Sequence, residues 1–343
     1  MKKKILVTGG TGYIGSHTCV ELIKKGYEVI IADNLSNSEI AVLDGIELIT
    51  GIKPIFRKIN LSDFKQTEIF FNEFHDIDTV IHFAALKAVG ESVSFPLKYY
   101  ENNIFSLVNV LKCMEKHKIN KIVFSSSCTV YGQPDIIPVT EQTPIKPAES
   151  PYGNTKQISE AILKDYCISN PEFKAIALRY FNPIGAHASG FIGELPLGTP
   201  TNLVPFVTQT AYGIRLELLI FGKDYNTPDG TAIRDYIHVC DLAAAHVAAI
   251  NRFDENISAQ NFEFFNVGTG SGTSVLEIVN SFIEISGIKL NFRFTDRRSG
   301  DIEKIWADTS YSEKVLKFKT EYSIKEALES AWNWEKYYRK NLR

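Results

Sequence analysis

The chain has 343 residues, and its 37 basic and 40 acidic side chains give a formal net charge of −3. This length allows one large domain or two moderate ones, and a hydrophobic content of 44% supports a substantial buried core. The balanced charge leaves no basic field that could gather nucleic acid, and no apolar stretch is long enough to span a membrane. Neither nucleic acid nor a membrane is therefore an expected partner.

The chain contains five widely spaced cysteines and no CxxC pair. An odd number of isolated cysteines predicts reduced thiols, and so a cytoplasmic location, and it argues against a zinc site. We expect no metal. The cysteines are Cys19, Cys113, Cys128, Cys167 and Cys240.

Short apolar runs alternate with longer helical patterns through the first half of the chain. Residues 5–8, 28–32, 79–84 and 121–125 are predicted strands, and residues 13–25 have the apolar spacing of a helix. These strands lack the alternation that marks one solvated face, so we expect them to be buried on both faces. Strands interleaved with helices predict an α/β fold with a Rossmann-type doubly wound parallel sheet.

The character of the sequence changes after the first half. Glycine and proline cluster in residues 185–205, which predicts a loop-rich segment suited to covering a ligand. Strand-like runs recur at 174–181 and 262–267, so we expect the second half to return to the sheet. The predicted domains are a Rossmann-type domain at 1–181, with further strands and helices returning from about 233–267, and a smaller, interleaved domain mainly at 182–343.

A glycine pattern follows the first predicted strand and opens the first predicted helix. Gly9, Gly12 and Gly15 allow a tight turn, close approach of the main chain to a pyrophosphate, and packing of helix on strand. Asp33 ends the next strand, where a carboxylate can hold the ribose hydroxyls of an adenosine and repel a 2′-phosphate. This context predicts NAD rather than NADP. The alternative is a plain glycine turn beside a solvated aspartate.

Tyr152 and Lys156 are four residues apart, which places phenol and ammonium on one helical face. Ser150 and Pro151 suit the cap and first turn of that helix. Tyrosine ionises near about 10, and we expect the ammonium and an oxidised nicotinamide to lower that pKa, so that the phenolate can accept a proton from an alcohol. Ser127, at a predicted strand end, can hydrogen-bond the same alcohol. Taken alone, the spacing is better explained by a solvated Tyr–Lys pair, and the serines at the predicted strand end favour the catalytic interpretation.

Six strings of sequence spread over the chain are far more specific than either short motif. They resemble the extended short-chain dehydrogenase/reductase superfamily and, within it, the family of UDP-glucose 4-epimerases, from end to end. The strings are VTGGTGYIGSHT at 7–18, DNLSNS at 33–38, VIHFAALKAVGES at 80–92, SSSCTVYG at 125–132, RYFNPIGA at 179–186 and RDYIHV at 234–239.

The resemblance implies that the first domain binds NAD and the second a UDP-hexose, in a homodimer. It implies that the catalytic residues are Tyr152, Lys156 and Ser127. The implied NAD-binding residues are Gly9, Gly12, Tyr13, Ile14, Gly15, Asp33, Asn34, Leu35, Ser36, Asn37, Ser38, Asn60, Leu61, Phe83, Ala84, Ala85, Leu86, Lys87, Asn103, Ser127, Tyr152, Lys156 and Phe181. The implied substrate-binding residues are Lys87, Ser127, Tyr152, Phe181, Asn182, Asn202, Leu203, Leu219, Ile220, Phe221, Arg234, Arg298, Asp301 and Ile305.

The resemblance also implies a reaction, the interconversion of UDP-glucose and UDP-galactose by inversion at sugar C4. Tyr152 takes the proton of the 4-hydroxyl, with Ser127 bridging, while a hydride passes from C4 to NAD and leaves a transient 4-keto sugar. The sugar then turns over, and hydride and proton return to its other face, so that NAD is regenerated and stays bound. Lys156 is the implied ribose ligand and electrostatic partner of Tyr152.

The chain departs from the family pattern at two positions. Asn60 stands where the family usually has an acidic residue near the adenine amino group, and its amide oxygen can still accept a hydrogen bond. Ile305 stands where members restricted to plain UDP-hexoses often carry tyrosine, and a smaller residue there is associated with N-acetylated UDP-hexosamines. Isoleucine is intermediate, so both substrate classes stay open.

Two other functions are compatible with the same fold. Nucleotide-sugar dehydratases share the glycines and the Tyr–Lys pair, but they carry an Asp-Glu pair where this chain has Cys128 and Thr129, neither of which is an effective acid at neutral pH. A non-catalytic NAD sensor or scaffold needs no base, and the predicted catalytic residues argue against it.

Four conspicuous side chains are assigned structural roles. His82 and His238 lack metal-like spacing to other ligands, so we expect them to be core or hydrogen-bonding residues. Trp332 and Trp334 lie in an aromatic C-terminal segment and are expected to pack a terminal helix rather than bind sugar.

Overall fold

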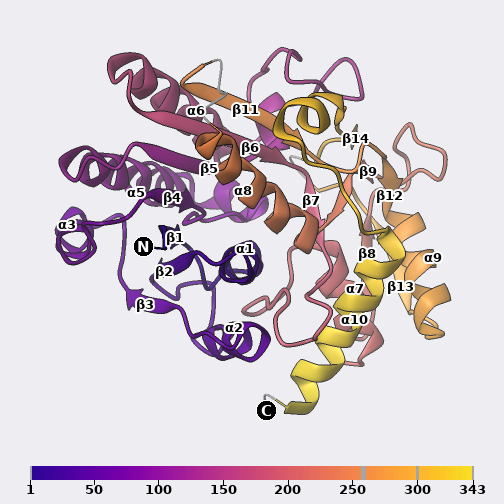
Figure 1. Cartoon of the computed structure of the whole chain (residues 1–343). Helices are drawn as coiled ribbons and strands as arrows, with labels where there is room; N and C mark the ends of the chain where they lie inside the picture. Colours follow the sequence, from indigo (N-terminus) through magenta and orange to yellow (C-terminus); the bar gives the residue numbers. More distant parts are fainter. Residues whose placement is uncertain (1, 256–259, 299–300, 342–343) are drawn as a thin grey trace.

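The computed structural model describes residues 2–255, 260–298 and 301–341. Its main sheet has seven parallel strands in the order β11-β6-β5-β4-β1-β2-β3 (Figure 1). The chain runs outward from β1 to β3 and then returns to β4 on the other side, so the topological switch point lies between β1 and β4. The strands are β1 Lys4–Thr8, β2 Glu28–Asp33, β3 Ile55–Lys58, β4 Thr79–His82, β5 Lys121–Ser127, β6 Lys174–Tyr180 and β11 Phe262–Val267.

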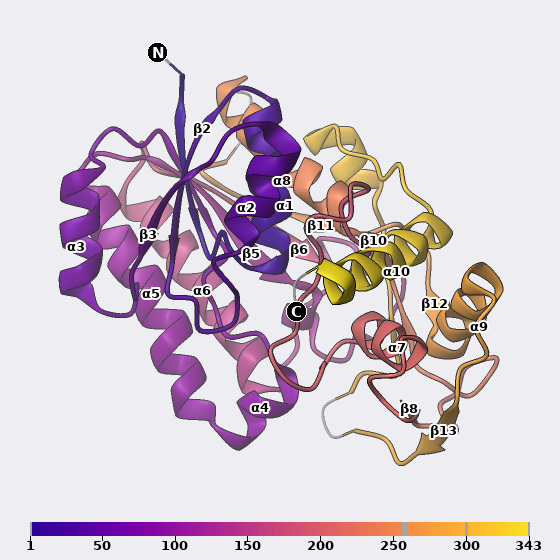
Figure 2. The same cartoon turned by 90° about the horizontal axis from the view of Figure 1, so that it is seen from below.

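Helices cover both faces of this sheet, as Figure 1 and Figure 2 show. Along β1, Ile5 and Val7 enter one apolar cluster and Leu6 enters the other, which explains why the strand is apolar without alternation. One face carries α1 Tyr13–Lys24, α2 Val42–Thr50 and α8 Val239–Asp254, and the other carries α3 Phe64–Glu73, α5 Pro96–Lys116 and α6 Pro151–Ser169.

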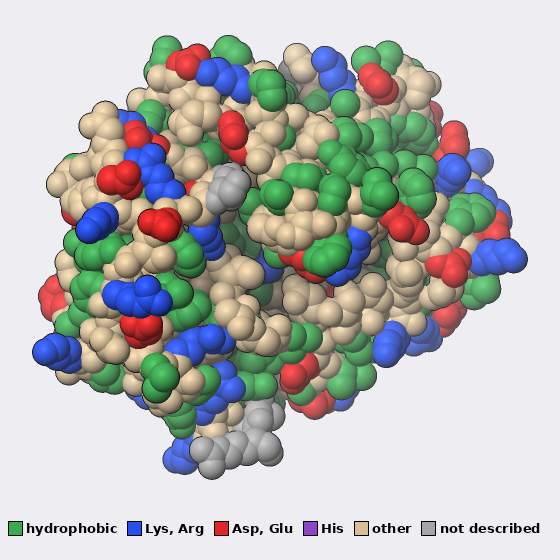
Figure 3. All heavy atoms as spheres, turned by 180° about the vertical axis from the view of Figure 1, so that it is seen from behind, with side chains coloured by type: hydrophobic (Ala, Val, Ile, Leu, Met, Phe, Trp, Pro, Cys, Tyr) green, Lys and Arg blue, Asp and Glu red, His purple; other side chains and the backbone are tan. Residues whose placement is uncertain are grey.

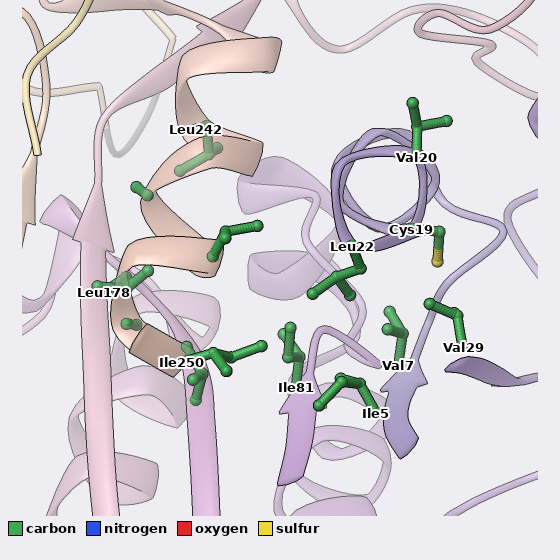
Figure 4. Packing of buried hydrophobic residues seen from close by; sticks show 14 of the residues in the cluster. Ile5, Val7, Cys19, Val20, Leu22, Val29, Ile81, Leu178, Leu242 and Ile250 are labelled. Carbon is green, nitrogen blue, oxygen red and sulfur yellow. The ribbon is translucent and has the colours of Figure 1, made fainter. Parts of the chain in front are cut away.

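The first cluster shows how distant segments form one core. Leu22 of α1 and Ile250 of α8 point toward Ile5 and Ile81 of the sheet (Figure 4). All four side chains are fully buried. Burial of such side chains contributes about 1.5–3 kcal/mol each, so α8 is an integral part of the sheet domain although it lies far along the chain.

A smaller layer of helices and short strands lies beside the carboxyl edge of the sheet (Figure 1). Its core packs α7 against α9 and α10, and it includes the partly buried Trp332. Trp334 is buried, so both tryptophans pack the terminal helix as predicted. The helices are α7 Leu203–Ala211, α9 Val275–Ser286 and α10 Ile324–Asn341. β7 Asn182–Ile184 pairs with β10 Tyr236–His238, and β8 Leu218–Phe221 pairs with β13 Phe292–Thr295. β9 Ile233–Arg234 lies between β12 Thr273–Ser274 and β14 Lys304–Ile305. Short helices α4 Val89–Ser94, η1 Cys128–Tyr131 and η2 Ser312–Leu316 complete the fold.

The structure confirms the predicted α/β class and most predicted elements. β4 ends at His82, two residues before its predicted end, and β5 continues to Ser127, two residues beyond its predicted end. β3 was not predicted, because it is short and largely solvated. β11 pairs with β6 in the sheet, whereas residues 256–259 of the predicted returning segment lie outside the described residues. The domain boundary near residue 181 stays a prediction.

Two general features bear on the chemistry. All five cysteines are free thiols. Within the described ranges, no helix is both long and apolar enough to cross a membrane, and no His, Cys, Asp and Glu group has a metal-binding arrangement. Basic and acidic side chains are interspersed over the face seen in Figure 3, in keeping with the balanced charge.

Candidate active site

The predicted site segments meet at one edge of the sheet. Because the strands are parallel, their carboxyl ends lie along the same edge, where ligands bind in such folds. The segments that follow those ends are 9–15 after β1, 33–38 at β2, 83–87 after β4, 125–127 at β5 and 181–182 after β6.

The glycine loop has the close contacts that a pyrophosphate site needs. Gly9 has a φ of +69°, in the left-handed region. A Cβ atom at Gly9 would lie 2.8 Å from the main-chain nitrogen of Ala84, and one at Gly15 would collide with the carbonyl oxygen of Gly9. Among the described residues, no side chain caps the start of α1 at Tyr13, so its free N–H groups and positive dipole end can bind an anion.

Asp33 joins the glycine loop to the loop after β2. Its carboxylate accepts hydrogen bonds from the main-chain nitrogens of Thr11, at 3.2 Å, and Leu35, at 2.9 Å. The hydroxyl of Ser38 lies 3.4 Å from the same carboxylate. The carboxylate is therefore fixed beside the glycines, as a ribose ligand must be. The other predicted residues of this loop are Asn34, Ser36 and Asn37, of which the last two are exposed.

Asn103 of α5 anchors the segment after β4. Its side-chain oxygen accepts a 2.8 Å hydrogen bond from the main-chain nitrogen of Leu86, and its nitrogen donates to the Leu86 carbonyl at 3.0 Å. The same nitrogen donates to the hydroxyl of Thr155 at 3.1 Å. Thr155 lies between Tyr152 and Lys156, so one buried amide connects the predicted cofactor segment to the catalytic helix. Sequence reasoning missed Thr155, although it lies within the Tyr-x-x-x-Lys motif.

Tyr152 and Lys156 lie near the start of α6, whose predicted serine cap and first-turn proline are both present. The ammonium of Lys156 is 5.7 Å from the centroid of the Tyr152 ring and 4.9 Å from that of Phe124. It donates a 2.6 Å hydrogen bond to the main-chain oxygen of Ser125. Lys156 is thus a buried cation close to a half-buried tyrosine, rather than half of a solvated pair.

The surrounding protein shifts the pKa values of both groups. Burial lowers the pKa of Lys156 to about 7, while the carboxylate of Glu160 acts in the opposite direction. Burial raises the pKa of Tyr152 to about 12, while a hydrogen bond with Ser127 acts in the opposite direction. The protein groups alone therefore raise the tyrosine pKa, because desolvation of the phenolate outweighs the hydrogen bond with Ser127. Lowering of this pKa by a bound nicotinamide stays a prediction.

Ser127 ends β5 and caps η1. Its hydroxyl oxygen accepts a 3.2 Å hydrogen bond from the main-chain nitrogen of Thr129, which fixes the side chain at the strand end. Cys128 follows it and is buried. Burial raises the pKa of the Cys128 thiol to about 12, so this position supplies no acid at neutral pH.

Three predicted substrate-binding residues, Phe221, Arg298 and Asp301, form one cluster. The guanidinium of Arg298 is 4.9 Å from the centroid of the Phe221 ring and donates to the carboxylate of Asp301 at 3.1 Å. Phe221 ends β8, which also carries the predicted residues Leu219 and Ile220. The structure therefore brings together residues from two distant segments, as the resemblance implies.

Arg234 ends the short strand β9. Its guanidinium donates to the carbonyl oxygens of Ile233, at 2.8 Å, and Glu303, at 3.3 Å. Arg234 pairs with Ile305 in the register of β9 and β14. Ile305 is buried in a cluster with Phe181 and Cys128, which places this predicted specificity residue next to the segment that follows Ser127.

Lys87 and Asn202, two predicted substrate residues, are connected by a glutamate that sequence reasoning missed. The carboxylate of Glu194 accepts hydrogen bonds from Lys87 at 3.3 Å and from Asn202 at 2.5 Å. Glu194 comes from the glycine-rich loop, whose residues show no periodicity that singles it out. Asn202 precedes α7, which begins at the predicted Leu203, and the predicted Asn182 begins β7.

Asn60, predicted to lie near the adenine, makes local hydrogen bonds in this structure. Its side-chain oxygen accepts hydrogen bonds from both the main-chain nitrogen, at 3.1 Å, and the hydroxyl, at 2.9 Å, of Ser62. An amide oxygen has two lone pairs, so in this turn it is already satisfied. Binding of an adenine by this oxygen stays a prediction, and the neighbouring Leu61 is buried.

The two histidines have the structural roles predicted for them. His82 is buried, and its Nδ1 lies 2.9 Å from the hydroxyl of Thr8. His238 is buried, and its Nδ1 accepts a 3.0 Å hydrogen bond from the main-chain nitrogen of Cys240. Its ring also stacks on Tyr322, with centroids 4.3 Å apart.

The fold and the site define a class of protein. The uncapped helix after a glycine turn and the acidic end of β2 fit a dinucleotide, and the Tyr–Lys pair with Ser127 fits proton exchange with an alcohol beside it. This is the arrangement of a dinucleotide-dependent enzyme that acts on an alcohol carbon. The chain belongs to the NAD dependent epimerase/dehydratase family, in a match that spans residues 5–268.

Individual relatives are similar over nearly the whole chain. The UDP-glucose 4-epimerase of Dictyostelium discoideum is 48% identical over 332 residues, which are 97% of this chain and 95% of that protein. The crystal structure of UDP-glucose 4-epimerase from Bifidobacterium longum in complex with NAD+ and UDP has a TM-score of 0.94 and 45% identity, with 99% of each chain covered. The UDP-Glc/GlcNAc 4-epimerase from Campylobacter jejuni has a TM-score of 0.82 and 36% identity, with 98% of this chain and 99% of that chain covered.

Proposed function

We infer that this chain interconverts UDP-glucose and UDP-galactose by inversion at sugar C4, with NAD as a retained cofactor. One observation carries the inference: Tyr152, Lys156 and Ser127 converge at the carboxyl end of β5, on the same edge of the sheet as the glycine loop. Relatives of the same fold, 45–48% identical over nearly the full length, are UDP-glucose 4-epimerases, and one binds NAD+ and UDP.

The protein supplies proton transfer and orientation. Tyr152 accepts the proton of the 4-hydroxyl and later returns it, and Ser127 bridges the two oxygens. Lys156 supplies the positive charge that offsets the burial of the phenolate. Bound NAD supplies a hydride acceptor and donor together with a positive ring that favours the phenolate.

The nucleotide must be held while the sugar turns. We propose that Arg234 and Arg298 bind the diphosphate, since a guanidinium matches two phosphate oxygens at once. Phe221 would pack against the uracil and Asp301 would accept from the ribose. The remaining predicted residues complete the cofactor and substrate pockets as the resemblance implies. The sugar end, bounded by Ile305 and Phe181, has an apolar wall that makes few directional contacts, which suits a ring that must present both faces.

N-acetylated UDP-hexosamines are a second substrate class. The similarity to a UDP-Glc/GlcNAc 4-epimerase supports this extension, and the buried Ile305 marks the position that tests it. Isoleucine leaves more room than tyrosine and less than cysteine.

We propose that two copies associate and that the enzyme acts in the cytoplasm. Apolar side chains on and around α4 and α5 are exposed, led by Leu97 at 81%, Phe95 at 59% and Phe105 at 53%. Exposed apolar residues gathered along neighbouring helices favour an interface. The free thiols favour a reducing compartment. Sedimentation of the protein and of Leu97→Glu tests association: a dimer that the substitution weakens is expected, and a monomeric parent protein would contradict it.

The reaction is tested by incubating the purified protein with UDP-glucose and identifying the product. UDP-galactose of unchanged mass is expected. A product lighter by one water would instead show a dehydratase, and retention of NAD without turnover would show a sensor or scaffold. Parallel incubation with UDP-N-acetylgalactosamine tests the second substrate class.

A further inference from the structure

A buried ion pair lies one helical turn beyond Lys156. The side chains of Glu160 and Arg179 are only 6% and 3% exposed. Both carboxylate oxygens of Glu160 accept from the guanidinium, at 2.9 and 2.6 Å. The guanidinium is also enclosed by two rings, with its carbon 4.0 Å from the centroid of Phe264 and 5.0 Å from that of Tyr131.

This ion pair is hydrogen-bonded to β5, the strand that ends at Ser127. The hydroxyl of Ser126 donates a 2.5 Å hydrogen bond to Glu160. Ser126 lies between Ser125, whose carbonyl oxygen accepts from Lys156, and Ser127, the predicted substrate ligand. Glu160 therefore binds the middle serine of the three. The serine before it accepts a hydrogen bond from Lys156, and the serine after it interacts with Tyr152.

The charge of Glu160 also matters to Lys156. The Cβ atoms of residues at i and i+4 of a helix lie about 5–6 Å apart, so both side chains start from one face of α6. The negative charge of Glu160 acts to raise the pKa of Lys156. Lys156 also interacts with Tyr152 on α6 and with His82 on β4, and neither is negatively charged at neutral pH in the protein without NAD. Beyond Glu160 stands Arg179, a cation. Among the described residues, Glu160 is thus the carboxylate that acts on Lys156.

We propose that Glu160, held by Arg179, is a positioning residue for epimerisation that keeps Lys156 charged and sets the register of Ser125–Ser127 against α6. This proposal rests on the proposed function. The competing view is that the ion pair only stabilises the fold. Replacing one partner of a buried pair is destabilising in either case, so a loss of stability cannot distinguish the two views.

A second ion pair provides a matched control. Arg252 and Glu263 form the same two-bond contact, at 2.7 and 2.6 Å, with side chains 7% and 8% exposed. They join α8 to β11, apart from the catalytic groups. Glu263→Gln therefore removes the same charge from a similarly buried pair and is expected to cost comparable stability.

The test compares the pH dependence of kcat in the two variants. Glu160→Gln keeps a hydrogen-bond acceptor but loses the charge, so Lys156 should lose its proton at lower pH. The alkaline limb of the kcat profile should move down by about one pH unit. Glu263→Gln should keep the parent profile. An unchanged profile in Glu160→Gln, or an equal shift in Glu263→Gln, would overturn the proposal.

Two further measurements keep the test decisive. If Glu160→Gln does not fold, Glu160→Gln combined with Arg179→Met removes the uncompensated cation, and the proposal predicts a smaller shift in the same direction. Lysine ¹³Cε titration by NMR, with the Lys156 signal identified by its loss in Lys156→Met, should show the same change in pKa without any substrate. A parent protein that makes no UDP-galactose would refute the proposed function, whereas an unmoved Lys156 titration would refute the positioning role.

Discussion

The ammonium of Lys156 donates a 2.6 Å hydrogen bond to the main-chain carbonyl oxygen of Ser125. Ser127 follows two residues later on β5, so this bond sets α6, which carries the proposed catalytic pair, against the strand that ends in the proposed substrate ligand. Because α6 and β5 are both packed elements of the sheet domain, the catalytic groups are held by rigid structure rather than by loops. The proposed chemistry depends on this juxtaposition.

Replacing Tyr152 by phenylalanine tests the proton acceptor. Tyr152→Phe should lower kcat by a factor of about 10²–10⁴, because the ring remains but the ionisable oxygen is gone. NAD content, measured after denaturing the purified protein, should match that of the parent. Turnover near the parent rate would refute the role of this tyrosine.

Shrinking Ile305 tests the sugar pocket. Ile305→Cys removes bulk from the buried wall beside Phe181, so the ratio of kcat/KM for UDP-N-acetylgalactosamine over UDP-galactose should rise. A gain of roughly tenfold is expected, since the atoms removed correspond to about 1–2 kcal/mol of steric discrimination. If the ratio does not change, Ile305 does not limit access.

Asp33 tests the choice of dinucleotide. Asp33→Asn keeps an oxygen that can accept from Thr11 or Leu35 but loses the charge that repels a 2′-phosphate. NAD affinity should fall and NADP affinity should rise, as measured by calorimetry on protein freed of nucleotide. An unchanged ratio of NAD affinity to NADP affinity would mean that Asp33 does not bind the adenosine ribose.

Four buried histidines should make the protein less stable at mildly acidic pH. Burial lowers the pKa of His17 and His82 to about 3 and the pKa of His238 and His246 to about 4. A histidine of the unfolded chain takes up a proton near about 6.5. Between these pKa values the unfolded state binds more protons, so stability is fully present above about 6.5 and falls as the pH drops, by up to about 1.4 kcal/mol per histidine and pH unit.

Urea unfolding at pH 7.5 and pH 5.5 measures this loss. The free energy of unfolding should fall by several kcal/mol, and His246→Leu, which lacks a titrating ring, should show a smaller fall. Equal stability of the parent protein at the two pH values would mean that these rings are protonated in the folded state.

The sequence predicted the sheet and its first helix because apolar runs without alternation and the glycine turn are local signals. It also placed Ser150 and Pro151 at the start of α6, since cap residues are read directly from the chain. It could not reveal β3, whose residues are mostly solvated and carry no strong apolar pattern.

The missed and corrected site features depend on tertiary contacts. Glu194 joins Lys87 to Asn202 across more than a hundred residues of chain, and no local motif predicts such a contact. The rise of the Tyr152 pKa depends on how completely the phenol is desolvated, which spacing to Lys156 cannot express.

The fate of the hydrogen on sugar C4 tests the central claim most directly. UDP-glucose that carries deuterium at C4 should yield UDP-galactose that still carries it at C4 in ordinary water, because the hydride leaves and returns within one closed site. A product that has exchanged this deuterium with solvent, or has lost a molecule of water, would contradict inversion by hydride transfer beside Tyr152.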